Sequence, residues 1–294
     1  MKKEVIITFG IPMYNSEMYI KELLDCFDHD CEISYEILIL NDGSTDNSEN
    51  ICRNYNNKNI RLINEKNSGV SVARNNIIKN ALGKYLTFID SDDLIDFKKY
   101  IDMVNKAQKN NFDLLINIPN NIKKKSIDYL IEKEIINSPC MKIYNTKLLR
   151  DNKILFDKNI NLGEDLIFNI KYFKTIKNIG FYYGNIYNYR KINMSSLTIK
   201  YRKEKFETLM SVNNICRLLL NSKKINKAFE YIRIKNCFSC IKTEKNNKSL
   251  NYEYIKKLKK YKKREYLFLN SIKSTIIYNA WYILPSRIIY LFFK

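Results

Sequence analysis

Histidine is almost absent from this chain, which has one, His29, among 294 residues. A Ser-His-Asp triad uses a histidine as its base, and a zinc site built on histidines needs several of them. His29 stands between Asp28 and Asp30, a setting typical of the protein surface. We therefore expect neither kind of centre.

Glycine, proline and long apolar runs are also scarce. The 7 Gly and 4 Pro leave few flexible linkers, and no run of 18 apolar residues predicts a membrane-spanning helix. The apolar start at 5–9 is too short for a signal peptide. Seven cysteines, an odd number at irregular spacing, fit a reducing compartment better than a disulfide framework. These features predict a globular, cytoplasmic protein.

Positive charge is concentrated in the second part of the chain. Residues 1–118 carry 14 Lys and Arg against 18 Asp and Glu, whereas the remaining 176 carry 37 against 13. Residues 256–264 hold seven cations in nine positions, and aromatic, apolar stretches follow at 274–285 and 288–293. One interpretation is an element on an anionic membrane surface, with Trp281 at the headgroup boundary. The other is a solvated basic helix followed by a terminal helix docked on the core.

Strand and helix signals alternate in the first 118 residues. We expect strands at 5–9, 36–40, 60–63, 85–89 and 113–118, and helices at 16–28, 46–55, 71–80 and 97–109. This alternation predicts βαβ units and an α/β fold with a mainly parallel sheet. A mixed pattern follows, with helices expected at 145–151 and 164–174, and nearly everything after residue 201 is typical of helices.

Three carboxylates directly follow the apolar strand pattern at 85–89. Asp90, Asp92 and Asp93 would surface at the carboxyl end of that strand, which is where open α/β sheets bind ligands. Two acids at positions i and i+2 can hold a hard divalent ion together with phosphate oxygens. The alternative is a solvated turn in which Asp93 or Asp96 caps the next helix.

Polar turns also follow the three preceding strands. They contribute Pro12, Tyr14 and Asn15, then Asp42, and then Asn67, Gly69 and Arg74. The first and third turns alone are compatible with an ordinary loop or a capped helix, whereas capping explains Ser44 and Asp46 of the second turn but not Asp42. Tyr14 offers a ring for base stacking, and a glycine before a helix whose first turns carry Arg74 suits a phosphate. Since the carboxyl ends of parallel strands meet at one edge, the four turns together predict a single ligand site.

These motifs, in this order, resemble the family 2 glycosyltransferases of the GT-A fold, of the bacterial surface-polysaccharide type. The matching segments are Pro12–Asn15, Asp42–Asp46, Asn67–Gly69, Ala73–Asn75 and Asp90–Asp93. A looser resemblance continues through Phe156, Gly163–Phe168 and Tyr187–Arg190, followed by Ser195, Ser196 and Thr198. The resemblance implies a Rossmann-like sheet with flanking helices, followed here by a helical C-terminal region.

The resemblance also implies roles for individual residues. Asp42 would bind the base of a nucleoside diphosphate sugar, Asp90 would touch its ribose, and Asp92 would hold Mg²⁺ or Mn²⁺ on the diphosphate. Asp165 would be the general base, with the adjacent Glu164 as the alternative. An acidic first turn of a helix, favoured by the macrodipole, explains the same two residues without catalysis. The rest of the implied donor site is Pro12, Tyr14, Asn15, Asn67, Gly69, Arg74 and Ser91.

The expected activity is inverting, metal-dependent hexosyl transfer from a nucleoside diphosphate sugar to a glycan or lipid-linked oligosaccharide in surface polysaccharide synthesis. The resemblance favours UDP as the nucleotide. Residues 1–118 would form the donor half of one GT-A domain, 119–200 its acceptor-side and catalytic half, and 201–294 a basic helical region. The membrane interpretation would place that region on the inner face of the plasma membrane.

A nucleic-acid-binding protein with an α/β domain is the main alternative, because the distal part of the chain is basic and rich in tyrosine. It leaves the acidic turns unexplained, and their charge would repel a phosphate backbone, so we expect no nucleic-acid partner. A dinucleotide-dependent oxidoreductase ranks lower, since no G-x-G-x-x-G follows the first strand.

Overall fold

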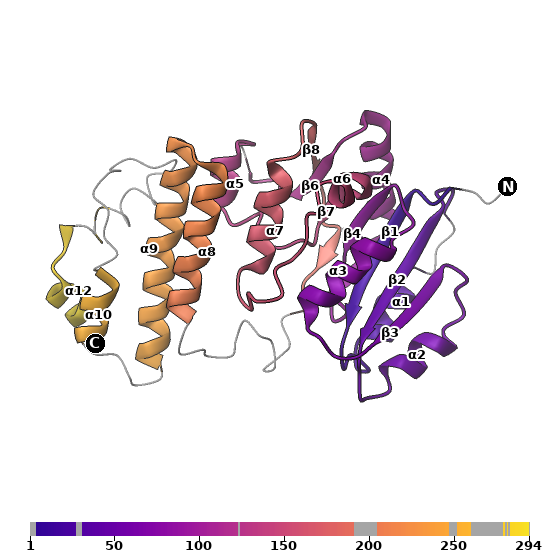
Figure 1. The fold of residues 1–294 in the computed structure, drawn as a ribbon, viewed down its shortest axis with the longest axis horizontal. Helices are drawn as coiled ribbons and strands as arrows, with labels where there is room; N and C mark the ends of the chain where they lie inside the picture. The colour runs from indigo at the N-terminus through magenta and orange to yellow at the C-terminus, as the bar shows by residue number, and fades with distance from the viewer. Residues whose placement is uncertain are drawn as a thin grey trace. The chain divides into compact units, whose positions relative to one another are not determined.

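The computed structural model describes residues 4–27, 31–122, 124–190, 205–246, 252–259 and 283–293, and the single positions 279 and 281 (Figure 1). It divides into two compact units, one of residues 1–123 and 138–192 and the other of 124–137 and 193–294. The short segment 124–137 therefore groups with the C-terminal helices. His29, Ser195, Ser196 and Thr198 lie outside the described residues.

A seven-stranded sheet in the order β3-β2-β1-β4-β7-β6-β8 forms the centre of the first unit. Its strands are β1 (Ile7–Met13), β2 (Tyr35–Asp42), β3 (Ile60–Glu65), β4 (Tyr85–Phe88), β6 (Leu114–Ile118), β7 (Lys142–Asn145) and β8 (Ile179–Tyr183). Only β7 runs antiparallel to its neighbours. The prediction of a mainly parallel α/β sheet is confirmed. A separate ribbon pairs β5 (Leu94–Ile95) with β9 (Tyr187–Asn188).

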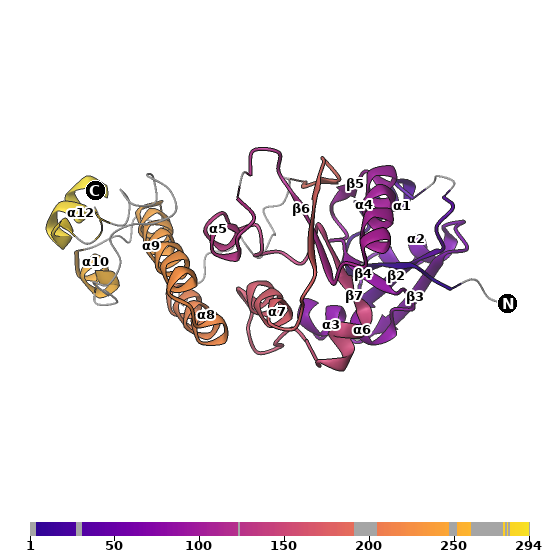
Figure 2. The same cartoon turned by 90° about the horizontal axis from the view of Figure 1, so that it is seen from above.

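Helices cover both faces of this sheet (Figure 2). One face carries α1 (Ile20–Asp25), α2 (Ser48–Asn54) and α4 (Phe97–Asn110), and the other carries α3 (Val70–Asn80), α6 (Thr146–Asp151) and α7 (Glu164–Phe173). Alternation along β1 builds the first interface, because Phe9 and Ile11 join the buried cluster that includes α1 and α4. Gly10 points the other way, where an added Cβ would lie 2.4 Å from Ile77 Cγ2 of α3. Glycine therefore lets α3 approach the sheet.

Strand β1 is longer than the sequence predicts. The expected strand ended at Phe9 with Pro12 in a loop, whereas β1 continues to Met13 and buries Pro12 opposite Leu40 of β2. The backbone of Gly10 faces β4, accepting from Ile89 N at 3.0 Å. Pro12, two residues on, faces the same side beyond the last β4 pair. Its missing N–H therefore costs no ladder bond.

The described residues of the second unit form helices joined by turns and loops, and no strand. Its helices are α5 (Ile127–Glu132), α8 (Lys205–Leu220), α9 (Lys223–Asn246), α10 (Tyr252–Lys259) and α12 (Ser286–Phe293). A buried cluster joins Ile234 of α9, Leu258 of α10 and Ile289 of α12 around Trp281. Within the described ranges, no helix has both the length and the hydropathy needed to cross a bilayer.

Candidate functional site

The first, second and fourth polar turns are tied together by side chains at the carboxyl edge of the sheet. Asn15 Oδ1 accepts from Thr45 N at 2.8 Å, and Asn15 N donates to Ser44 Oγ at 3.0 Å. Ser16 Oγ lies 2.7 Å from Ser91 Oγ. Three segments that are distant in the sequence thus form one surface. Tyr14 stands on it with half of its area exposed, while the neighbouring Pro12 is buried inside β1.

Asp42 links the third turn to the second through hydrogen bonds. Its side chain is buried, and its two carboxylate oxygens accept from Ser68 N at 2.7 Å and Gly69 N at 2.9 Å. Gly69 has a φ of 91°, which favours glycine. A carboxylate has about four acceptor positions, so Asp42 can still accept from a base N–H. These two hydrogen bonds give Asp42 a positioning role that the sequence did not indicate.

The fourth turn contains acids with different surroundings. Asp93 is buried, and its carboxylate accepts from the Tyr187 hydroxyl at 2.7 Å and Arg190 N at 2.9 Å. Asp93 therefore anchors the β5–β9 ribbon, and the cap of α4 is Asp96, which accepts from Lys99 N. Asp90 and Asp92 remain partly exposed at the strand end.

Arg74 joins this edge to the start of α7. Its Nη2 lies 3.0 Å from Asp90 Oδ1, and its Nη1 lies 2.7 Å from Asp165 Oδ1. The arginine side chain is only 6% exposed, against 26% and 24% for the two carboxylates. Burial by itself would lower the pKa of Arg74, but Asp165 and Asp90 hold that pKa above its ordinary value. The guanidinium therefore stays charged between them.

The residue after Arg74 holds the other side of the same junction. Asn75 donates to Phe156 O at 2.9 Å and accepts from Phe156 N at 2.8 Å. The Phe156 ring lies 5.4 Å from Arg74 Cζ and stacks on Phe168 of α7 at 3.9 Å between centroids. The expected donor segment and the expected acceptor-side segment are thus fixed to one another. Sequence reasoning quoted Asn75 and Phe156 as motif residues but missed this contact.

The surroundings of Asp165 bring its pKa close to neutral pH. Burial raises the pKa of its carboxyl to about 7, with Arg74 opposing the shift and Glu164 and Asp90 adding to it. A base is most effective when its pKa lies near the working pH. The structure places the adjacent Glu164 at the start of the same helix, partly exposed.

Lys142 of β7 is a buried cation near Asp165 that sequence reasoning missed. Its Nζ donates to Ser138 O at 2.5 Å, and burial lowers its pKa to about 8, with Asp165 acting in the opposite direction. It lies in a short strand without a recognisable motif, so no sequence signal identified it.

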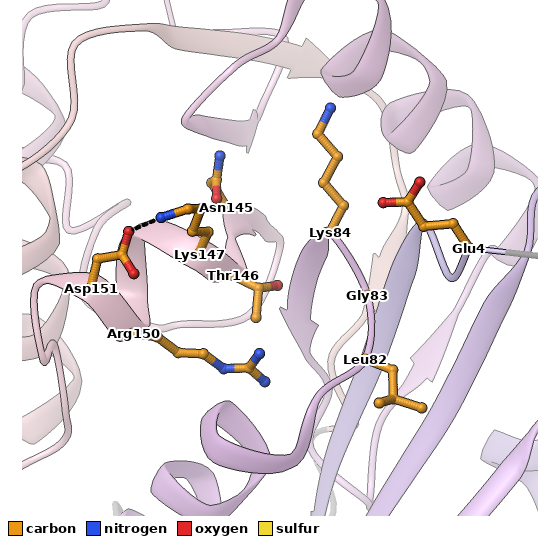
Figure 3. Close-up of a pocket in the computed structure, with 9 residues that line it drawn as sticks. All are labelled: Glu4, Leu82, Gly83, Lys84, Asn145, Thr146, Lys147, Arg150 and Asp151. Atoms are coloured by element: carbon orange, nitrogen blue, oxygen red, sulfur yellow. Dashed lines mark hydrogen bonds and ion pairs between the residues drawn. The ribbon is translucent and has the colours of Figure 1, made fainter.

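A cavity of about 360 Å³ lies away from these residues, near Lys84, which directly precedes β4 (Figure 3). Its lining shares no residue with the predicted site. Arg150 turns to carbonyl oxygens at the end of α3, donating to Ile78 O at 2.8 Å, and Lys147 pairs with Asp151. Much of the charge that lines the cavity is therefore used in structural contacts.

The described residues contain no group of three or more His, Cys, Asp or Glu side chains able to hold a metal ion. Asp92 is an oxygen donor of the hard type that Mg²⁺ and Mn²⁺ accept. Mg²⁺ commonly binds through one or two carboxylates, phosphate oxygens and water. The donor set at this edge fits a metal that arrives with a diphosphate, and does not fit an ion held by protein alone.

Comparison with known proteins supports the same architecture. The chain is 28% identical over 220 residues to the uncharacterised glycosyltransferase EpsJ of Bacillus subtilis, covering 66% of this chain and 63% of EpsJ. It is 30% identical over 191 residues to the poly(ribitol-phosphate) beta-glucosyltransferase of Bacillus spizizenii, covering 59% and 30%. The chain thus spans less than two thirds of these relatives' length.

Among solved structures, Staphylococcus aureus TarS 1–349 in complex with UDP aligns with a TM-score of 0.62 and 25% identity, covering 85% of this chain and 78% of that one. The complex of the same protein with UDP-GlcNAc aligns with a TM-score of 0.65 and 24% identity, covering 85% and 79%. These likenesses confirm the predicted GT-A fold. The model of the family described as "Glycosyl transferase family 2" matches residues 8–176. The chain belongs to glycosyl transferase family 2.

Proposed function

We propose that this chain transfers a hexose from a UDP-sugar to a glycan acceptor in surface polysaccharide synthesis, with inversion and with help from a divalent metal. The observation that carries the proposal is the meeting of Asp90 and Asp165 on the Arg74 guanidinium. It brings a carboxyl that titrates near neutral pH next to the acids of the donor-side turn. The family match favours this function over the nucleic-acid-binding alternative.

The proposed reaction is a single displacement at the anomeric carbon. Asp165 removes the proton from the acceptor hydroxyl as its oxygen bonds to that carbon, while the carbon–oxygen bond to the diphosphate breaks and its electron pair leaves with UDP. In this scheme Asp165 acts only as a base, and no side chain of the enzyme attacks the sugar as a nucleophile. One displacement therefore inverts the configuration. Glu164 remains the alternative base.

Asp92 would hold the metal, which supplies positive charge against the departing diphosphate. Asp42 would accept from the base, Asp90 would contact the ribose, and Tyr14 would lie against the base. Asn15, Asn67, Gly69 and Ser91 would complete the donor site, and a donor contact through Pro12 stays a prediction. The division of the chain at residues 118 and 200 also stays a prediction.

The relatives support UDP as the nucleotide. TarS, which is 25% identical in the structure comparison, was crystallised with UDP. The matched curated proteins include a glucosyltransferase and N-acetylglucosaminyltransferases acting on poly(ribitol phosphate). A UDP-hexose or UDP-N-acetylhexosamine is therefore the first donor class to test, and a polyol-phosphate or saccharide chain the first acceptor class.

UDP is expected to bind the chain, and Asp42→Ala is expected to weaken that binding by about tenfold or more, since a hydrogen bond to a charged group contributes about 1.5–3 kcal/mol. Calorimetry with UDP measures this without an acceptor. Asp113→Ala is the matched control, because Asp113 Oδ2 likewise accepts from two backbone groups, Lys177 N and Asn178 N, before β6.

Equal UDP affinity of the Asp42 and Asp113 variants would show that the donor base lies elsewhere. The activity itself is tested by release of nucleoside diphosphate from UDP-, GDP- and TDP-linked sugars with Mn²⁺, using water as the acceptor. A failure to release UDP from any UDP-sugar would overturn the proposed donor.

We also propose that the second unit attaches to an anionic membrane surface. On α12 and the residues before it, Ile283, Ile288 and Leu291 are 74%, 47% and 62% exposed, next to the exposed Arg287. Ile289, by contrast, is buried in the cluster that contains Trp281. An exposed apolar stripe beside a cation suits the headgroup boundary. The expectation for Trp281 is wrong, because its side chain is fully buried and cannot insert.

The full chain is expected to float with vesicles containing phosphatidylglycerol and not with phosphatidylcholine vesicles. The double change Ile288→Asp and Leu291→Asp should abolish flotation, whereas Leu218→Asp on α8, where the leucine is 81% exposed, should not. Because screening acts over about 8 Å at 0.15 M salt, the assay is run at that ionic strength. Equal flotation of all three proteins would refute a role for the stripe.

A further inference from the structure

We propose that Arg74 is a positioning residue for the base Asp165, holding it against the donor-side turn, rather than a ligand of the donor phosphates. This inference rests on the proposed function, in which Asp165 accepts the acceptor's proton. The sequence alone suggested a phosphate contact, because a glycine precedes a helix that carries Arg74 in its first turns.

The geometry commits both ends of the guanidinium fork to carboxylates. Nη1 donates to Asp165 at 2.7 Å and Nη2 to Asp90 at 3.0 Å. Nε is buried and has no hydrogen-bond partner among the described residues. A planar fork with two occupied ends fixes the separation and angle of its partners. Asp90 and Asp165 are thereby set at a defined spacing.

The arginine is itself held rigidly. Phe156 lies under its guanidinium, and the paired hydrogen bonds of Asn75 fix the Phe156 backbone. Phe156 in turn stacks on Phe168 of α7, the helix that begins with Glu164 and Asp165. The base therefore sits on a helix packed against the same ring that supports its partner. Positions held in this way keep a catalytic group within reach of the reacting atoms.

The charges around Asp165 predict how the base responds when Arg74 is changed. Charged or titratable neighbours come from four elements: Arg74 of α3, Asp90 after β4, Glu164 of α7, and Lys142 and Tyr144 of β7. Arg74 is the first among those that favour the ionised carboxylate, and Glu164 and Asp90 oppose it. Loss of the guanidinium leaves the acids less compensated, so the carboxyl should hold its proton to higher pH.

The test is the pH profile of UDP release from UDP-N-acetylglucosamine or UDP-glucose, whichever the wild-type chain uses. Wild type should gain rate as pH rises through about 7 and then level off. Arg74→Gln should shift this rising limb of the pH profile to higher pH by about one unit or more, since a nearby opposite charge lowers an acid's pKa by about 1–3 units. At pH 7 the rate should fall about fivefold or more, and raising the pH should recover part of it.

Arg74→Lys separates charge from position. It keeps a cation but not the fork, so its limb should stay near that of wild type while its plateau rate falls. It also provides a second folded protein if Arg74→Gln is unstable. Arg61→Gln is the matched control, because Arg61 pairs with Glu36 at 3.0 Å at the opposite end of β2, and both its limb and its plateau should be unchanged.

The outcomes distinguish this inference from the proposed function. If Asp165→Asn is inactive but both Arg74 variants keep the wild-type limb and plateau, the base stands and the positioning role is overturned. Marked weakening of UDP binding by Arg74→Gln with an unmoved limb would return Arg74 to the donor phosphates. If Asp165→Asn keeps wild-type activity, the proposed base itself is wrong.

Discussion

Replacing Asp165 by asparagine is expected to slow sugar transfer by about 10²–10⁴-fold, the usual contribution of a positioned general base. The change keeps the size of the side chain and an oxygen that accepts from Arg74 Nη1, which Asp165 contacts at 2.7 Å. It removes the group that takes up a proton. UDP affinity should persist, because Asp165 belongs to the acceptor side. Initial rates and calorimetry on the same preparation measure both quantities.

Two further variants make this result specific. Asp157→Asn is a control from the segment before α7, where Asp157 Oδ1 accepts from Asn159 N at 3.0 Å, and it should behave as wild type. Glu164→Gln tests the alternative base. Near wild-type turnover of Asp165→Asn together with an inactive Glu164→Gln would transfer the role to Glu164. Activity of both variants would contradict base catalysis from this helix.

Replacing Asp92 by alanine is expected to reduce metal-dependent turnover by about 10³-fold, because a metal contributes several kcal/mol to the transition state and each 1.4 kcal/mol is tenfold. Asp92 lies partly exposed in the turn after β4, so its loss should leave the melting temperature close to that of wild type. The measurement is UDP release over a Mn²⁺ titration, with Mn²⁺ binding followed in the presence of UDP.

Asp96→Asn is the matched control for this change. Asp96 lies four residues further along and caps α4 by accepting from Lys99 N at 3.1 Å, a role that asparagine also fills. Its metal response should equal that of wild type. Full turnover of Asp92→Ala in the presence of a chelator would contradict the metal assignment and leave the base prediction untouched.

The parallel sheet and the location of the site could be predicted from the sequence for a physical reason. Strands buried on both faces are continuous apolar runs, as in β4, and the change from such a run to Asp90–Asp93 marks a strand end directly. The carboxyl ends of parallel strands share one edge, so the turns with Asp42 and Asp90 had to lie along the same edge of the sheet. The end of β1 could not be predicted in the same way. Pro12 was expected in a loop, but β1 can include this proline because β4 stops pairing with β1 before Pro12.

The tertiary structure decided how the site residues are used. Asp42, Arg74 and Asp93 could each be recognised as polar turn residues, but their partners are distant in the chain. Asp42 binds backbone groups of the third turn, Asp93 anchors the β5–β9 ribbon, and Arg74 reaches Asp165, 91 residues away. A local pattern reports which side chains leave the core at a strand end. Which oxygen faces which nitrogen depends on the packing of α3, α7 and the sheet, and no local pattern contains that.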